Sequence, residues 1–198
     1  MLKIGITGGI GSGKTTVCKI FETLGIPVFY ADNVAKQIMA TDELLVSGVK
    51  KVFGVESYFG DGSLNNKHIA NIVFNNIDQL NKLNALVHPA VFRAFDTWFA
   101  NLPKGIPYTL KEAALLFESG SYQMSDKNVL VVSPTKLKLE RVIKRDSVTE
   151  EQVVARMNKQ LSDKQKLKMA DFIVHNDDEH SLITQVMELH QQFLNLKF

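Results

Sequence analysis

Short apolar runs alternate with amphipathic stretches along most of this chain. The runs that predict β-strands are residues 3–7, 27–30, 128–132 and 172–174, and residues 106–117 contain a further strand that we expect at 113–117. Several stretches between them repeat apolar positions every three or four residues, as in residues 15–24, where Val17, Ile20, Phe21 and Leu24 share one helical face. Because strands separated by helices form βαβ units, the pattern predicts an α/β fold with a mostly parallel sheet.

Two stretches depart from this alternation. Residues 68–102 have a helical pattern without a strand, which predicts a helical insertion beside the sheet. Residues 145–168 are charged and carry two capping-box spacings, Thr149 with Gln152 and Ser162 with Gln165, so we expect a projecting helical hairpin, a candidate lid. The expected layout is a single domain with a core at about residues 1–60, 105–145 and 169–198, an insertion at about 61–104 and a lid at about 145–168.

Composition narrows the class of protein. The chain has 198 residues, 45% hydrophobic and 22% charged, as is ordinary for a globular protein. The formal net charge of +2 argues against a general nucleic-acid binder, and no apolar run approaches the ~20 residues of a membrane span. The N-terminus is interrupted by glycines, unlike a signal peptide, and the single cysteine forms no intrachain disulfide. We therefore expect a soluble, cytoplasmic protein without nucleic-acid or membrane partners.

The most informative motif is the glycine-rich segment from Gly8 to Thr15, which matches G-x-x-x-x-G-K-[ST]. It follows an apolar strand and opens an amphipathic helix, as phosphate binding requires. Its glycines let backbone N–H groups approach an anion, and the start of the helix adds positive potential. Lys14 would contact the β- and γ-phosphates of a nucleotide, and the Thr15 hydroxyl would ligate Mg²⁺. The motif predicts a site for a nucleoside triphosphate.

The rest of the chain indicates which kind of phosphate-loop protein this is. Its Asn-Lys pairs lack the Asp of a guanine-reading segment, and its length suits a small-metabolite kinase. Asp32 follows a predicted strand and is either the acceptor of a hydroxyl proton or a helix cap. Glu118 is either a carboxylate that orients substrate or holds Mg²⁺ through water, or a cap; Glu112 is expected to be a solvated edge residue. A nucleotide-binding switch without transfer activity is the alternative from another class.

Basic residues cluster after the fourth predicted strand. Lys138, Arg141 and Arg145 recur at i, i+3 and i+7 on one helical face. Such a face is either solvated or, beside a lid and a phosphate loop, a source of cations for the transferred phosphate. In the helical insertion, the pair of His88 and Pro89 is expected to interrupt the helix, and His88 is either a packed or capping residue or a substrate contact.

Together these segments resemble the dephospho-CoA kinase family. The matching segments are ITGGIGSGKTTV at 6–17, YADNVAK around Asp32, NALVHP ending at Pro89, ALLFE at 114–118, LERVIKRD at 139–146 followed by VTEEQV, and ADFIVHN at 170–176. The glycine-rich loop alone is common to many enzymes. The combination is far more specific and covers nearly the whole chain.

The resemblance implies a three-layer P-loop kinase fold, with a five-stranded parallel sheet, a helical substrate-binding insertion and a helical lid. It implies that ATP, with Mg²⁺, phosphorylates the ribose 3′-hydroxyl of dephospho-CoA to give CoA and ADP. By position, Asp32 resembles the general base, Arg141 the arginine near the transferred phosphate, Asn176 an adenine contact, and His88 a residue of the acceptor region. Glu118, at the end of the ALLFE segment, is also expected to bind the substrate. The implied phosphate site comprises Gly9, Gly11, Ser12, Gly13, Lys14, Thr15 and Thr16.

One departure from the resemblance bears on the site. The family often has Asp-Ala-Asp where this chain has Tyr30-Ala31-Asp32, so the first carboxylate is missing and the second is kept. If the missing carboxylate helps to hold Mg²⁺ or the acceptor ribose, we expect Glu118 or water to take over that task.

Overall fold

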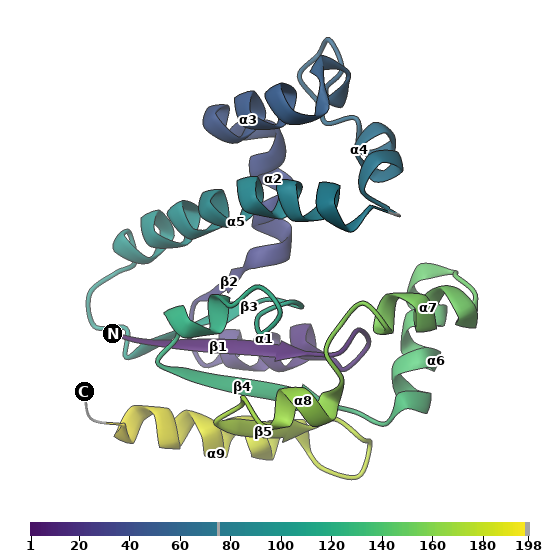
Figure 1. The fold of residues 1–198 in the computed structure, drawn as a ribbon. Helices are drawn as coiled ribbons and strands as arrows, with labels where there is room; N and C mark the ends of the chain where they lie inside the picture. Colours follow the sequence, from purple (N-terminus) through teal and green to yellow (C-terminus); the bar gives the residue numbers. More distant parts are fainter. Residues whose placement is uncertain (75, 197–198) are drawn as a thin grey trace. The chain divides into compact units, whose positions relative to one another are not determined.

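The computed structural model describes residues 1–74 and 76–196. Contacts divide the chain into two compact units (Figure 1). The sheet unit comprises residues 1–30 and 103–198, and the helical unit comprises residues 31–102. Within the described residues, no helix is long and apolar enough to cross a membrane.

The sheet unit is built on five strands in the order β2-β3-β1-β4-β5. All neighbouring pairs are parallel, which confirms the expected α/β class. The strands are β1 (Leu2–Gly8), β2 (Val28–Tyr30), β3 (Tyr108–Glu112), β4 (Lys127–Val132) and β5 (Phe172–His175). Parallel strands end at one common edge of the sheet, so the glycine-rich segment after β1 lies at the edge where open α/β sheets bind ligands.

Helices α1 (Lys14–Thr23) and α9 (Leu182–Asn195) cover one face of this sheet. Phe21 of α1 is fully buried and meets Tyr108 of β3 edge-on, with ring centroids 6.2 Å apart. Phe193 of α9 stacks on Phe21 at the same centroid separation. On the other face, a Cβ at Gly5 would lie 2.8 Å from Leu116, so the turn after β3 approaches the sheet closely. The sheet is therefore covered on both faces, as the three-layer fold requires.

The third strand lies within the predicted range of residues 106–117, but its expected position at residues 113–117 was wrong. The strand is β3 (Tyr108–Glu112), and residues 114–117 of the expected strand form turns. Leu116 and Phe117 are buried without joining the sheet, since they cover its second face rather than extend its ladder. Glu112, expected to be a solvated edge residue, is the last residue of β3 and only 6% exposed.

Two helices of the candidate lid begin at the residues that the capping-box spacings predict. After α6 (Thr135–Asp146), helices α7 (Glu150–Met157) and α8 (Asp163–Leu167) each begin with a complete capping box, on Thr149 and Ser162 respectively. The expectation that this whole stretch projects was wrong for α8. Its Lys166 is fully buried and the helix contacts β4, so α8 packs on the sheet.

The helical unit has a core of its own. It contains α2 (Ala31–Thr41), α3 (Glu43–Phe53), α4 (Asn66–Val73) and α5 (Ile77–Ala100), with short 3₁₀ turns at Val55–Ser57 here and at Ser121–Met124 in the sheet unit. The buried side chains of this core are Met39, Leu45, Val49, Phe53, Tyr58, Ile69 and Ala90.

Two expectations for this region differ from the structure. The unit begins at Ala31 rather than near residue 61, because α2 and α3 both pack against α5. Helix α5 also runs through Pro89, which was expected to interrupt it. The next turns of α5 bury Ala90, Val91 and Phe95, and this packing carries the helix past the missing backbone donor.

The aromatic cluster between α1 and the sheet gives a stability prediction. Replacing Phe21 by Ala removes a fully buried ring from its contacts with Tyr108 and Phe193. We expect the free energy of unfolding to fall by about 3–5 kcal/mol, measured by urea denaturation. Lys19→Ala, at an exposed position of the same helix, is the control and is expected to change it by less than about 0.5 kcal/mol. Equal effects of the two substitutions would contradict this account of the core.

Candidate active site

The glycine-rich loop has the backbone geometry of an anion cradle. It joins the end of β1 at Gly8 to the start of α1 at Lys14. Gly11 and Gly13 have φ angles of 78° and 91°, a region that side chains disfavour. A Cβ at Gly11 would lie 2.5 Å from the Lys138 carbonyl, and one at Gly13 would collide with the Asn176 amide. Both positions therefore require glycine, and the first N–H groups of α1 are directed out of the helix N-terminus toward the loop, where an anion can accept from them.

Lys14 and Thr15 lie where the motif predicts them, at the start of α1. The Lys14 side chain is buried, and its Nζ donates to the carbonyls of Gly8 at 3.1 Å and Gly9 at 3.4 Å. The ammonium is thus folded back over the loop, within reach of an anion in it. Thr15 and Thr16 are exposed in the first turn of the helix.

Arg141 and Asn176 meet beside this loop. The Asn176 Nδ2 donates to the Ser12 carbonyl at 2.8 Å, which ties the end of β5 to the loop. Arg141 of α6 donates to the Asn176 carbonyl at 3.2 Å and to Asp178 at 3.0 Å. The fold therefore brings together Ser12, Arg141 and Asn176, three residues that the sequence assigned to the nucleotide site. Arg141 also fixes the orientation of Asn176.

Glu112 is a carboxylate that the sequence reasoning set aside. It ends β3, next to β1, and is paired in register with Ile6 and Tyr30. Side chains alternate along a strand, so Glu112 lies on the α1 face with Tyr108, whose ring contacts Phe21. Burial raises the pKa of the Cys18 thiol in α1, and the Glu112 carboxylate raises it further. Burial is also the main cause that raises the pKa of Tyr30, followed by Cys18 and Glu22, and Glu112 adds the smallest contribution.

The sheet unit therefore offers oxygen ligands of the kind that Mg²⁺ prefers. The Thr15 hydroxyl is exposed at the start of α1, and the Glu112 carboxylate lies at the carboxyl edge of the neighbouring strand. No group of three or more His, Cys, Asp or Glu side chains suited to a metal occurs in residues 1–74 and 76–196. The sequence would have indicated Glu112 as a site residue if the third strand had been predicted to end there, because ligands bind at the carboxyl ends of parallel strands.

Glu118 has a structural partner rather than a position in the loop. Its Oε1 accepts the Leu161 N–H at 2.8 Å and lies 3.0 Å from the Lys166 Nζ. The Lys166 side chain is fully buried, and the Glu118 side chain is 16% exposed. This buried ion pair ties the turn after β3 to α8, so the ligand role foreseen for Glu118 has no support in these contacts.

The basic face of α6 is only partly solvated. Lys138 is buried and pairs with Asp163 of α8 at 2.7 Å. Arg145 and Arg156, in contrast, both pair with Asp146 and are at least 48% exposed in their side chains. The solvated alternative thus fits Arg145 and fails for Lys138. Burial of Lys138 was invisible in the sequence because it depends on α8, which returns to the sheet from a distant part of the chain.

Asp32 and His88 belong to the helical unit. Asp32 is the second residue of α2, immediately after the carboxyl end of β2, and is the acidic residue of that first turn. His88 lies in α5 with its ring 6.4 Å from that of Phe92.

Comparison with known proteins gives a consistent result. The family model described as dephospho-CoA kinase matches residues 2–181. A dephospho-CoA kinase of Bacteroides fragilis is 37% identical over 188 residues, which cover 95% of this chain and 91% of that protein. One from Salinibacter ruber is 40% identical over 178 residues, 89% of each chain.

Solved structures agree. A crystal structure of a Thermus thermophilus protein superposes with a TM-score of 0.87 at 30% identity and covers 98% of both chains. Dephospho-CoA kinase from Campylobacter jejuni superposes with a TM-score of 0.70 at 27% identity over 96% of both chains. Shikimate kinase from Bacteroides thetaiotaomicron, at 13% identity and a TM-score of 0.53, shares the fold.

The Glu118 contacts predict an asymmetric effect on stability. Glu118→Ala leaves the Lys166 ammonium buried without its acidic partner, so we expect a loss of about 3–5 kcal/mol in the free energy of unfolding. Lys166→Met keeps the volume and removes the buried charge, and is expected to cost clearly less. Denaturant unfolding of both variants measures the difference. A Glu118→Ala variant as stable as the parent chain, or less affected than Lys166→Met, would rule out the pairing as an anchor of α8.

Proposed function

The chain belongs to the dephospho-CoA kinase family, and we propose that it transfers the γ-phosphate of ATP to the ribose 3′-hydroxyl of dephospho-CoA, giving CoA and ADP. It is an ATP-dependent phosphotransferase. The observation that carries the proposal is the match of the family model along residues 2–181, together with a glycine-rich loop whose geometry requires glycine at two positions. We further propose a cytoplasmic location, where ATP is supplied.

The nucleotide phosphates are bound by the loop from Gly9 to Thr16 in this proposal. Backbone N–H groups of the loop donate to phosphate oxygens, and Lys14 places its charge against the β- and γ-phosphates. Asn176, held by Arg141 and tied to Ser12, borders the nucleoside side of the site. Support comes from the hydrogen bonds that link Arg141 to Asn176 and Asn176 to Ser12 of the loop.

Thr15 and Glu112 are the residues that would hold Mg²⁺, the first directly and the second through water. When bound, Mg²⁺ would supply a compact positive charge that offsets the negative charge of the phosphates during transfer. Glu112 would also replace the carboxylate that is missing at residue 30. Tyr30 and Glu112 are register partners on adjacent strands, so the carboxylate has moved across one strand instead of to Glu118.

Asp32 is proposed as the base. Its carboxylate orients the 3′-hydroxyl and accepts its proton while the hydroxyl oxygen bonds to the γ-phosphorus, and the bond from that phosphorus to the β–γ bridging oxygen breaks to release ADP. Its place directly after β2 supports this role, since acceptors bind at the carboxyl ends of such strands. The helical unit, with His88, is proposed to bind the rest of dephospho-CoA.

The function is tested by product analysis. Protein, ATP and Mg²⁺ are mixed with dephospho-CoA, gluconate, shikimate, CMP or adenosine, and products are identified by mass spectrometry. We expect one phosphate to be added to dephospho-CoA alone. Phosphorylation of another acceptor instead would overturn the substrate, and ADP without a phosphorylated acceptor would favour a nucleotide switch.

Asp32→Asn tests the base. We expect kcat to fall roughly 10²- to 10⁴-fold with nearly unchanged ATP affinity, because the nucleotide is bound by the other unit. Asp78→Asn makes the same charge change in the first turn of α5 and is expected to leave kcat unaltered, which separates a base from a helix-terminal charge. If both variants keep the parental kcat, Asp32 is not the base.

Glu112→Gln tests the Mg²⁺ site. The substitution keeps the shape of the buried side chain and removes its charge, so we expect the Mg²⁺ concentration for half-maximal activity to rise about tenfold. Glu22→Gln is the control, because Glu22 also raises the pKa values of Cys18 and Tyr30 but is exposed on α1. Mg²⁺ titrations that coincide for both variants and the parent chain would remove Glu112 from the metal site.

A further inference from the structure

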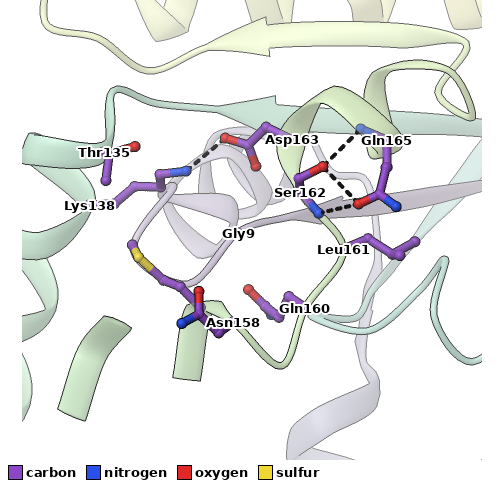
Figure 2. A pocket seen from close by; sticks show the side chains of 10 residues that line it. Gly9, Thr135, Lys138, Asn158, Gln160, Leu161, Ser162, Asp163 and Gln165 are labelled. Carbon is purple, nitrogen blue, oxygen red and sulfur yellow. Dashed lines mark hydrogen bonds and ion pairs between the residues drawn. The ribbon is translucent and has the colours of Figure 1, made fainter. Parts of the chain in front are cut away.

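A cavity of about 440 Å³ adjoins the glycine-rich loop on the side of α6 and α8 (Figure 2). Gly9 of the loop forms part of its wall, and Lys138 of α6 forms another part. Residues 158–163, which we call the return segment, run from the end of α7 to the start of α8 along the same cavity. In Figure 2 the joined side chains of Lys138 and Asp163 lie on one side, and Asn158 and Gln160 lie on the other.

Lys138 is an unusual residue for this position. Its side chain is 9% exposed, yet it carries a charge that is costly to remove from water. Its Nζ lies 2.7 Å from Asp163 Oδ2, and a Cβ built on Gly9 would lie 3.5 Å from that Nζ. The ammonium is therefore held directly against the phosphate-binding loop, where packing alone would favour an apolar side chain.

A second hydrogen-bond donor at the same end of the loop is also bound by a side-chain oxygen of the return segment. The N–H of Ile10 donates to Gln160 Oε1 at 3.0 Å. The return segment thus supplies one oxygen to a loop N–H and another to the buried ammonium. Both are donors of the kind that bind phosphate oxygens, and both are satisfied here by side-chain oxygens from residues 160 and 163.

We propose that Lys138 binds the terminal phosphate of the bound nucleoside triphosphate, and that Asp163 holds its ammonium in position until that phosphate replaces the carboxylate. The inference rests on the proposed function only in requiring a nucleoside triphosphate in the loop. No covalent bond changes in this exchange, because Lys138 stays protonated and trades one anionic oxygen for another.

The two partners are suited to such an exchange. A lysine carries a compact charge on a flexible stem, so a small rotation redirects Nζ without moving α6. The Asp163 side chain is 32% exposed, so its carboxylate can be hydrated once released. Lys14 already serves the β–γ junction in the proposed site, and Lys138 adds a cation specific to the γ-phosphate, which a diphosphate lacks.

The prediction is a change in discrimination between triphosphate and diphosphate. Isothermal titration calorimetry measures the affinities of ADP and of a non-hydrolysable ATP analogue, each with Mg²⁺, for the full chain. For Lys138→Met we expect the analogue to lose roughly 10- to 100-fold in affinity, with ADP nearly unaffected. For Asp163→Asn we expect the reverse, a tighter analogue relative to ADP, because a competing carboxylate is gone.

The controls separate a phosphate contact from a packing role. Lys136→Met removes an exposed charge from the same helix and is expected to leave both affinities unchanged. Lys138→Arg retains the charge and is expected to restore part of the discrimination. Equal weakening of both ligands by Lys138→Met, or an unchanged ratio, would overturn the proposal. Weaker analogue binding by Asp163→Asn would also overturn the proposal. If Lys138→Met does not fold, the analogue affinity of Asp163→Asn tests the proposal instead.

The result of this calorimetric test does not depend on which acceptor substrate the protein phosphorylates. Calorimetry contains no dephospho-CoA, so an error in the acceptor assignment leaves this test intact. If the parent chain phosphorylates dephospho-CoA while the variants keep the parental ratio of affinities, the assignment of Lys138 alone fails.

Discussion

The site in the sheet unit depends on the absence of side chains at Gly11 and Gly13. A Cβ at Gly11 would press on the backbone of α6, and one at Gly13 would collide with Asn176. Glycine at these places lets α6 and the end of β5 approach the loop while its backbone donors stay directed at an anion. Asn176 and Lys138 reach the loop for this reason, and Arg141 holds Asn176, although all three lie more than a hundred residues away in the sequence.

Two buried ion pairs connect the short helix α8 to the rest of the sheet unit. Lys166 with Glu118 attaches it to the turn after β3, and Asp163 with Lys138 attaches it to α6 beside the loop. The first pair is nearly closed to solvent, whereas the second has a partly hydrated carboxylate. A buried pair contributes little net stability but strongly penalises the loss of one partner. The first is therefore suited to anchoring, and the second to exchanging one anion for another.

A carboxylate on a neighbouring strand lies beside the position of one acid that this chain lacks. The resemblance to the kinase family leads one to expect an acid at residue 30, where this chain has tyrosine. Parallel pairing sets Glu112 beside that tyrosine, on the face that α1 covers. Register partners on neighbouring strands lie about 5 Å apart, so the Glu112 carboxylate lies beside the position of the missing acid. Asp32, one residue beyond Ala31, is unaffected by this change.

The sequence by itself determined the features encoded locally. These are the strand-loop-helix of the phosphate loop, the capping boxes of α7 and α8, and the alternation that specifies a parallel sheet. It misplaced β3 because residues 113–117 are all apolar, whereas residues 108–112 include Thr109, Lys111 and Glu112, and only pairing with β1 distinguishes the strand from the buried turn. Burial of Glu112 and Lys138, and the diversion of Glu118 to Lys166, were decided by tertiary structure alone. A charge at a given position has no preferred environment until distant segments bring its partner and exclude water.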